Sequence, residues 1–313
     1  MKLPDNRGCF SKVQDERYCL RHCGHSVVKT RNLPVILKPT VIASIVLYFL
    51  SFNCLSQEIP ISLTYKSTMI GYGTSSVYDS YLSPLKYTGN NFGLHFEQMK
   101  NTSLMEENIF AQQLVNINYS QSENTPGTAS YYTGIFEYNY GLLYRFRPVE
   151  KLQIFTGTQV GGLMGFVYNT RNGNNPATGK AHLNLSLSAI ANYRIQIHSQ
   201  PVNLRYQFSL PFIGAMYSPQ FGQSYYEIGL GVTDGLVHCA SFHNHFSARS
   251  MLMAEVPLNR FTLSLAYHYS FYETRINDLD TQLITNTFYI GISRNFFIVR
   301  GKHKKNNYRY VFD

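Results

Sequence analysis

The chain has 313 residues, and only 14% of them are charged, against roughly 25% in ordinary soluble domains. Aromatic residues reach 15%, with 25 Tyr, 21 Phe and no Trp, while the mean hydropathy is only -0.19. This hydropathy excludes a bundle of membrane-spanning helices. Low charge combined with many tyrosines is typical of a barrel whose strands alternate lipid-facing and water-facing side chains.

The net charge of +9 comes from the two ends of the chain. Residues 1–56 supply +5 and residues 300–313 supply +4, so the region between them is neutral. A nucleic-acid-binding domain needs basic residues clustered on a folded face. Blocks of like charge outside the folded region are better explained as solvated segments, and we expect no nucleic-acid partner.

Residues 38–56 have the features of a secretory signal peptide. A lysine precedes the apolar run PTVIASIVLYFL, and the small residues Cys54 and Ser56 follow it. A charged start, a short apolar run and a small-residue exit define such a signal. The run is too short to span a bilayer comfortably as a helix, which needs about 20 residues. We expect residues 1–37 to be a disordered leader or the result of a start codon assigned too far upstream, and residues 301–313 to be a basic tail.

From residue 57 onward, apolar and polar residues alternate in long runs. In the clearest run, residues 181–198, apolar residues at odd positions share one face, polar residues at even positions share the other, and only Ile190 breaks the pattern. Period two over this length predicts a strand with one apolar and one polar face. Such runs are longer than ordinary strands of about 5–6 residues. Tyr and Phe at the ends of the apolar faces favour an aromatic girdle in a membrane.

Connections of alternating length set the number of strands. Twelve strands are predicted, near residues 62–72, 91–101, 107–120, 130–147, 151–168, 181–198, 201–217, 224–233, 236–243, 247–256, 260–273 and 284–299. The longer polar connections are predicted at residues 74–90, 121–128, 170–180, 218–223 and 276–282. Because membrane barrels have short periplasmic turns and longer outer loops, residues 57–300 are predicted to form an all-β, antiparallel up-and-down transmembrane β-barrel. A turn near Asn244 is needed for twelve strands, and ten is the alternative.

Three stretches resemble a family of uncharacterised outer-membrane β-barrel proteins, a domain of unknown function, from anaerobic gut-type Gram-negative bacteria. The stretches are Asp79–Pro84 with Tyr87 and Gly89, Arg171–Pro176, and Ser218–Glu227. The resemblance covers nearly the whole chain after the signal peptide but not residues 1–37. It implies a barrel in the cell outer membrane, and it supplies no chemistry because the family has no known function.

Catalytic and metal-binding motifs are weak. His268 with Ser270, and His182 with Ser186, lie on polar strand faces, but such pairs arise by chance in a wall rich in Ser and His, and a triad is recognised by geometry. The histidines at 238, 243 and 245 lack an evident further ligand, and the Cys and His residues of the leader lack a folded context for zinc. We therefore expect no enzyme, no cofactor and no metal.

A candidate site lies in the barrel lumen and one outer loop. The candidate residues are Glu137, Arg194, Arg205, Ser218, Tyr225, Tyr226 and Glu227. Arg194 is expected directly opposite Arg205, facing the lumen, with Glu137 or Glu97 as the counter-charge, because facing like charges are destabilising. Tyr225 and Tyr226 are expected on a strand, one facing lipid and the other the lumen.

The function predicted from these features is a small channel, a binding barrel or a scaffold in the outer membrane. Its expected partners are outer-membrane lipid and the barrel-assembly machinery, with an unidentified small molecule or ion as ligand. The alternatives are an outer-membrane hydrolase acting on lipid or peptide, and a soluble secreted β-sandwich. A wide porin is disfavoured, because open aqueous pores are typical of 16–18 strands.

Overall fold

The computed structural model describes residues 62–298, except for residues 103, 105–107, 174, 198–199 and 259–260. The predicted leader, signal peptide and basic tail lie outside the described residues. Their boundaries therefore remain predictions.

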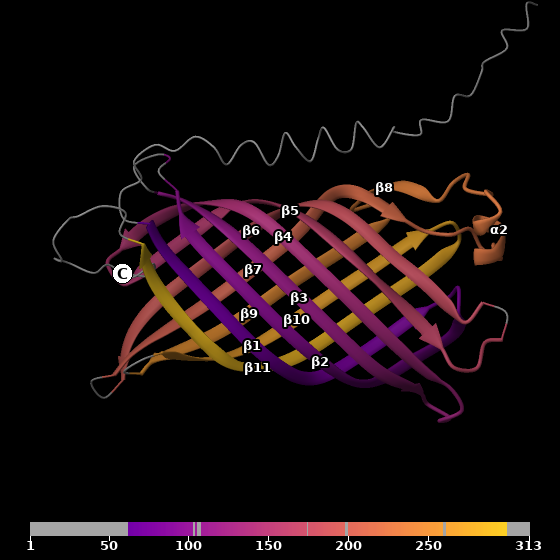
Figure 1. Ribbon diagram of the computed structural model, residues 1–313, viewed down its shortest axis with the longest axis horizontal. Coiled ribbons are helices and arrows are strands. Elements are labelled where there is room, and N and C mark those ends of the chain that lie inside the picture. The colour runs from indigo at the N-terminus through magenta and orange to yellow at the C-terminus, as the bar shows by residue number, and fades with distance from the viewer. Residues whose placement is uncertain are drawn as a thin grey trace, which may run out of the picture. The chain divides into compact units, whose positions relative to one another are not determined.

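Ten long strands form a closed antiparallel barrel, and one short strand lies outside the ring (Figure 1). The strands of the ring are β1 Ser62–Asp79, β2 Ser83–Asn101, β3 Ile109–Asn124, β4 Ser130–Val149, β5 Leu152–Asn169, β6 Ala177–Ile197, β7 Gln200–Tyr217, β9 His245–Pro257, β10 Thr262–Ile276 and β11 Leu279–Ile298. Each strand pairs with the next in this order, and β11 pairs with β1. Closure leaves the ring without an open sheet edge, as the sequence analysis predicted.

The prediction of twelve strands is wrong, and the alternative of ten is confirmed. The segment expected as a strand at residues 224–233 contains a short helix, α2 (Tyr225–Gly229), which begins at a capping box between Ser224 and Glu227. The segment expected at 236–243 contains only β8 (Val237–Ser241), which pairs with the end of β7. The turn near Asn244 exists, but it joins β8 to β9 without adding a strand to the ring.

Several predicted loops are strands. The predicted connection at 74–90 is mostly strand, because β1 continues to Asp79 and β2 starts at Ser83. The predicted connection at 276–282 contracts to a two-residue turn at Asn277 and Asp278, both with positive φ, as in the tight turns that favour a hairpin. The ring strands reach up to 21 residues, whereas about 9–11 suffice to cross a membrane.

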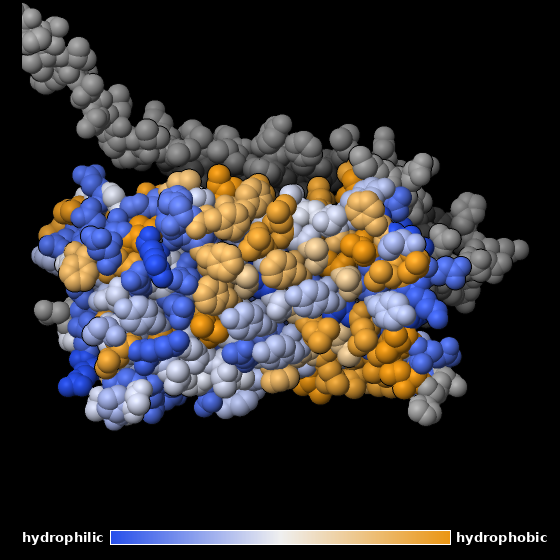
Figure 2. Space-filling view, turned by 180° about the vertical axis from the view of Figure 1, so that it is seen from behind, coloured by the Kyte–Doolittle hydropathy of each residue, from blue (hydrophilic) through white to orange (hydrophobic). Residues whose placement is uncertain are grey.

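The alternation of faces is confirmed on the outside of the barrel. Leu183, Leu187 and Tyr193 of β6 are exposed, while the polar residues between them are buried. In Figure 2 the apolar side chains gather toward one end of the barrel, and the end that carries α2 is more hydrophilic. The strands therefore extend past the apolar belt on the α2 side. Within the described residues, helices are all too short or too polar to cross a membrane.

Two apolar layers lie inside the barrel, one near each end, and a smaller apolar cluster of Met69, Met251, Met253, Ala266 and Tyr289 lies between them. The layer near the strand ends joined by the short turns consists of Leu63, Tyr65, Met99, Phe110, Leu143, Phe155 and Ile190. The layer near α2 includes Val77, Leu82, Tyr87, Tyr131, Val167, Met216 and Tyr272. Ile190, the one break in the alternation of β6, is therefore an inward-facing residue of the apolar layer near the short turns.

Candidate functional site in the barrel lumen

Ion pairs cross the lumen at three depths. The deepest pair, Arg205 with Glu97, lies toward the short turns. Arg249 pairs with Glu137 at 3.4 Å (Nη1 to Oε2) in the middle, and Lys180 pairs with Asp79 at 2.8 Å (Nζ to Oδ2) toward α2. These three ion pairs are called the cross-lumen pairs.

The strands that carry each pair lie on facing walls. Glu97 is on β2 and Arg205 on β7, and β7 is the fifth strand from β2 in either direction round the ring. Asp79 on β1 and Lys180 on β6 are related in the same way. Each of these two pairs therefore bridges the full width of the barrel and occupies the centre of the lumen.

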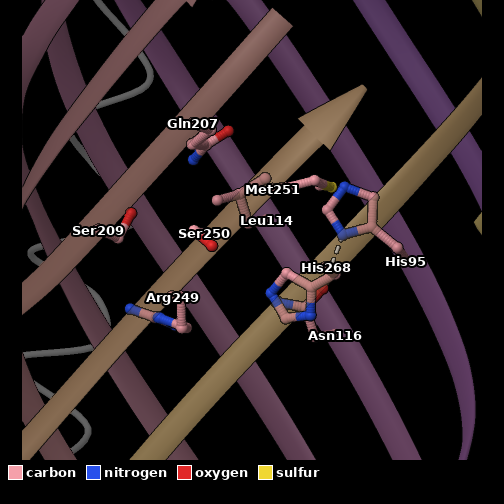
Figure 3. A pocket seen from close by; sticks show the side chains of 9 residues that line it. All are labelled: His95, Leu114, Asn116, Gln207, Ser209, Arg249, Ser250, Met251 and His268. Atoms are coloured by element: carbon pink, nitrogen blue, oxygen red, sulfur yellow. Dashed lines mark hydrogen bonds between the residues drawn. The ribbon is translucent and has the colours of Figure 1, made fainter. Parts of the chain in front are cut away.

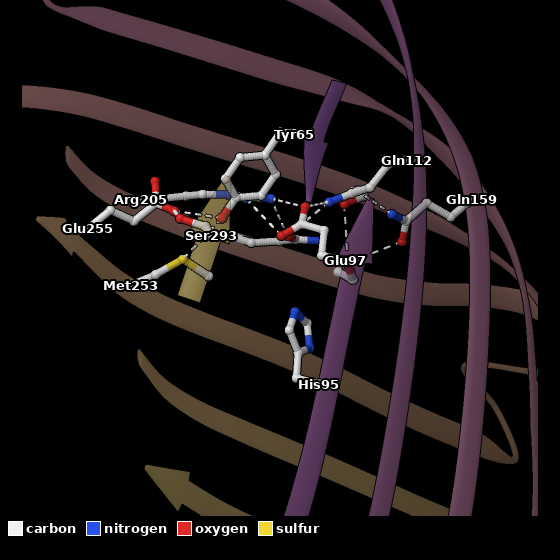
Figure 4. Close-up of polar contacts among 12 residues, drawn as sticks. Tyr65, His95, Glu97, Gln112, Gln159, Arg205, Met253, Glu255 and Ser293 are labelled. Carbon is white, nitrogen blue, oxygen red and sulfur yellow. Dashed lines mark hydrogen bonds and ion pairs between the residues drawn. The ribbon is translucent and has the colours of Figure 1, made fainter. Parts of the chain in front are cut away.

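The deepest pair is bidentate and fully buried (Figure 4). Arg205 donates from Nη1 to Oε2 of Glu97 at 2.8 Å and from Nη2 to Oε1 of the same carboxylate. Gln112 on β3 donates to the same Glu97 oxygen at 2.6 Å, and Gln207 accepts from Arg205 at 3.1 Å. Parallel N–H donors on a carboxylate give both strength and a fixed orientation.

Further polar groups extend this layer across the lumen. Glu255 on β9 accepts from the hydroxyl groups of Tyr65 at 2.6 Å and Ser293 at 2.8 Å. On the other side, Gln159 donates to Gln112 at 2.8 Å and accepts from Ser209 at 3.4 Å. The layer therefore links strands all round the ring, and buried carboxylates within it receive hydrogen bonds as burial requires.

A cavity of about 20 Å³ lies at mid-depth in the lumen (Figure 3). It is lined by His95, Leu114, Asn116, Gln207, Ser209, Arg249, Ser250, Met251 and His268. Nδ1 of His95 lies 2.7 Å from Oδ1 of Asn116, an acceptor, so this nitrogen carries the hydrogen. The volume suits about one water molecule.

The outer mouth is covered by the loop that carries α2. The Tyr225 hydroxyl accepts from the Gly179 backbone N–H on β6, and the Tyr225 ring packs edge-on against Tyr81. The Tyr81 hydroxyl donates to the backbone oxygen of Gln223 at 2.7 Å. Burial, followed by the nearby Tyr225, raises the pKa of Tyr81 to about 12, so this hydroxyl remains protonated at neutral pH. The loop is thus tied to the β1–β2 turn and to β6.

The predicted register of β6 and β7 is off by two residues. The structure pairs Asn192 with Arg205 and Arg194 with Asn203, so the two arginines are on neighbouring strands but not opposite each other. Arg194 is exposed near the strand end, whereas Arg205 is buried. Glu97 is the counter-charge of Arg205, and Glu137 pairs with Arg249 instead. The like-charge conflict is therefore avoided by the register itself.

The predicted loop residues do not form one cluster. Ser218 directly follows β7, and its backbone oxygen accepts from Asn277 at 3.2 Å. Tyr225 and Tyr226 lie on α2 and not on a strand, so the prediction of one lipid-facing and one lumen-facing ring is wrong; Tyr225 packs over the mouth and Tyr226 is 75% exposed. Glu227 is exposed and caps α2. The motif Ser-x-x-Glu at 224–227 is a capping-box signal that would have predicted this helix.

Neither predicted Ser–His pair forms a hydrogen bond among the described residues. His182 instead lies against His245, with ring centroids 4.3 Å apart. A serine–histidine contact does occur in the turn after β8, where the Ser241 Oγ lies 2.5 Å from Nδ1 of His243. Described residues offer no group of three His, Cys, Asp or Glu side chains placed to hold a metal ion.

Residues 46–303 match a family model described as protein of unknown function (DUF3316). The chain belongs to this family. The match spans the whole barrel, and the resemblance noted from the sequence is confirmed to the extent that the family is one of unknown function. Among curated proteins the sequence has no significant match.

Several solved structures match this chain at low sequence identity. The outer membrane protease OmpT from Escherichia coli matches at 7% identity and a TM-score of 0.40, over 77% of this chain and 99% of that one. The translocator domain of the autotransporter NalP from Neisseria meningitidis matches at 10% identity and a TM-score of 0.34, over 81% and 95%. Ail from Yersinia pestis matches at 10% identity and a TM-score of 0.28, over 74% and 98%.

Proposed function

We propose that this chain is an outer-membrane β-barrel with a sealed lumen, which acts as a non-enzymatic scaffold or binding barrel and not as an open channel. The observation that carries the proposal is the set of cross-lumen pairs, which place hydrogen-bonded side chains from facing walls at the centre of the lumen.

Insertion in a membrane is supported by the outer face of the barrel. Exposed side chains on the wall include Phe92, Phe136, Leu142, Leu187, Phe208, Leu252, Leu265 and Phe288. Such a belt costs free energy in water and is stable in lipid. Lipid also requires every backbone group of a spanning sheet to be hydrogen-bonded internally, which ring closure achieves. This favours the membrane barrel over the alternative of a soluble β-sandwich.

A sealed lumen is supported by what fills it. One apolar layer lies on the turn side of the Arg205–Glu97 pair, and another lies at the level of the Lys180–Asp79 pair near α2. Two cavities inside the barrel have volumes of about 20 and 30 Å³, whereas sites for small molecules typically need about 300–1,000 Å³. A permeating solute would have to separate buried ion pairs, so we place any binding role at the outer loops. In this proposal the chain is exported, folded by the barrel-assembly machinery and held by outer-membrane lipid, in a Gram-negative bacterium of the anaerobic gut type.

Planar-bilayer recording tests the proposal. Folded protein, verified by its heat-modifiable mobility on a gel, should insert and give no conductance steps, while a porin added under the same conditions should give them. Reproducible single-channel steps from the wild-type chain would overturn the sealed lumen. Failure of the protein to co-fractionate with the outer membrane would overturn the location.

A second candidate, a hydrolase, is favoured only by the contact between Ser241 and His243. A working triad also needs a third group that orients the histidine. If the chain hydrolyses an ester or peptide substrate and Ser241→Ala abolishes that turnover while leaving the barrel folded, the hydrolase replaces the scaffold.

A further inference from the structure

The outer face of β7 stays apolar almost to the end of the strand, and β8 continues it (Figure 1). The exposed, outward-facing side chains of β7 include Leu204, Tyr206, Phe208 and Ile213. β8 pairs with the end of β7, where Cys239 lies opposite Ala215. Directly opposite residues of an antiparallel pair point to the same side of the sheet.

Four exposed side chains therefore form one apolar surface at the outer end of the barrel. They are Ile213 and Ala215 on β7 and Val237 and Cys239 on β8, and they are called the β7–β8 face. Val237 is 74% exposed. The surface is continuous with the apolar wall below it.

The facing wall has a different pattern. On β1 and β2 the apolar outer face ends at Tyr72 and Phe92, whose rings pack edge to face with centroids 5.0 Å apart. Beyond them the outward positions are polar, with Thr74 paired to Asn90 and Ser76 paired to Thr88. The apolar surface thus reaches closer to the outer end of the barrel on β7 and β8 than on β1 and β2.

Asn244 closes part of the outer edge of β8. Leu236 accepts from the Ser218 backbone N–H on the β7 side, so the backbone groups of Cys239 and Ser241 point away from β7. The Asn244 side chain donates to the Cys239 oxygen at 2.8 Å and accepts from the Ser241 N–H at 3.0 Å. The Asn244 backbone N–H donates to the Ser241 oxygen at 3.0 Å. Lipid offers no hydrogen bonds to a strand edge, and these contacts replace them.

Charged side chains are also absent from the β7–β8 face. Between Arg205 and Arg249 the sequence contains two charged residues, Glu227 and Asp234. Both belong to the loop that joins β7 to β8. A charge on a lipid-facing wall is destabilising, so the composition of this face is compatible with contact to lipid.

We propose that the β7–β8 face lies in the outer leaflet of the membrane, where lipid covers it in place of water or a protein partner. The outer boundary of the membrane then runs at a slant, from the tips of β7 and β8 to Tyr72 and Phe92 on the facing wall. Transfer of an exposed apolar face out of water is favourable. Because the loop that carries α2 joins β7 to β8, lipid contact at both ends of this loop holds it over the mouth. The inference rests on the proposed membrane location.

Tryptophan fluorescence tests the proposal. The chain contains no Trp, so one introduced Trp is the only indole. The full-chain variants Val237→Trp and Ile213→Trp are folded into phosphatidylcholine vesicles, with or without bromine atoms near the headgroup end of the acyl chains. Bromine quenches an indole that it contacts. Both variants should lose most of their emission in the brominated vesicles, while iodide in the water should quench them only weakly.

Thr88→Trp, on the polar extension of β2, is the matched control for a position in water. It should keep its emission in brominated vesicles and be quenched by iodide. If either Val237→Trp or Ile213→Trp behaves like this control, water reaches the β7–β8 face and the lipid contact is overturned, which leaves a protein partner as the occupant. Equal bromine quenching of Thr88→Trp and Val237→Trp would overturn the slanted boundary.

Failure of the membrane location itself gives another result. Leu187→Trp, on the exposed apolar wall of β6, reports whether the barrel is in lipid at all. If Leu187→Trp also keeps its emission in brominated vesicles, the proposed location fails. If Leu187→Trp is quenched but Val237→Trp is not, the location stands and only the lipid contact of the β7–β8 face fails.

Discussion

Replacing Arg205 by Met tests whether the deepest cross-lumen pair holds the facing walls together. The side chains of Arg205 and Glu97 are 1% and 0% exposed. Arg205→Met removes both donors from the carboxylate and leaves Gln112 as a remaining donor to it. The variant therefore leaves the Glu97 carboxylate buried without its guanidinium partner. Removing one partner in this way costs more stability than removing both.

The expected loss follows from this geometry. Breaking a buried ion pair by removing one partner costs about 3–5 kcal/mol, whereas replacing both partners by apolar residues is often close to neutral. The double variant Arg205→Met/Glu97→Leu should lose only about 1–2 kcal/mol, because Gln112 then loses one of its two acceptors and keeps the other, Gln207. The double variant should thus be more stable than the Arg205→Met single variant.

Urea-induced unfolding of the barrel in lipid vesicles measures these differences. Arg194→Met is the control, since Arg194 is an exposed arginine on the neighbouring strand, and a substitution at an exposed position should change the free energy of unfolding by about 0.5 kcal/mol or less. The reasoning is refuted if Arg205→Met costs no more than this control. It is also refuted if the double variant is as unstable as the single one.

Three further changes probe the wall, the core and the outer loop. Leu187→Arg should impair assembly by about 2–4 kcal/mol, as for a charge on the lipid face at mid-depth, whereas Thr88→Arg, on the exposed polar extension of β2, should be tolerated; equal effects in vesicle folding would mean that the apolar belt is misplaced. Gly93→Val should destabilise the barrel by about 1–3 kcal/mol in urea unfolding, because a Cβ there would contact the Tyr289 ring, and wild-type stability would contradict the packing. The backbone hydrogen bond at the cap of α2 lowers the pKa of Glu227, so the carboxylate stabilises α2 above the ordinary value of 4.5 and this stabilisation is lost as pH falls through the lowered pKa. A spin label on α2 should accordingly gain mobility in acid, and Glu227→Gln should remove the pH dependence.

The sequence by itself determined the two faces of the strands and therefore the class of fold. Period-two alternation is local, since neighbouring side chains of a strand point to opposite sides, and the run at 181–198 correctly separated outer from inner positions. Even its exception was informative, because Ile190 is an inward-facing residue of an apolar layer. Closure of the sheet was also foreseeable, since lipid leaves no partner for an open edge.

The number of strands was harder to predict, because a strand pattern and a helix-capping signal occur together in the segment between β7 and β9. Residues 224–233 can be read as a short strand, but the capping box from Ser224 to Glu227 satisfies backbone donors locally and favours a helix. The predicted lengths of the loops were wrong for a related reason. Polar residues in the extensions of β1 and β2 resemble a loop, yet they are strand, because the two extensions pair with each other as far as Asp79 and Ser83.

Only the tertiary structure decided which charges meet. The sequence placed Arg205 inside the barrel and nominated Glu97 as one of two counter-charges, but the partners are separated by 108 residues and lie on facing walls. Their meeting depends on the number of strands in the ring and on the stagger of each pair of strands. A shift of two residues in one register, such as the one between β6 and β7, preserves every local pattern while changing which side chains are opposite. Alternation fixes the face of each residue, and only the closed ring fixes its partner across the lumen.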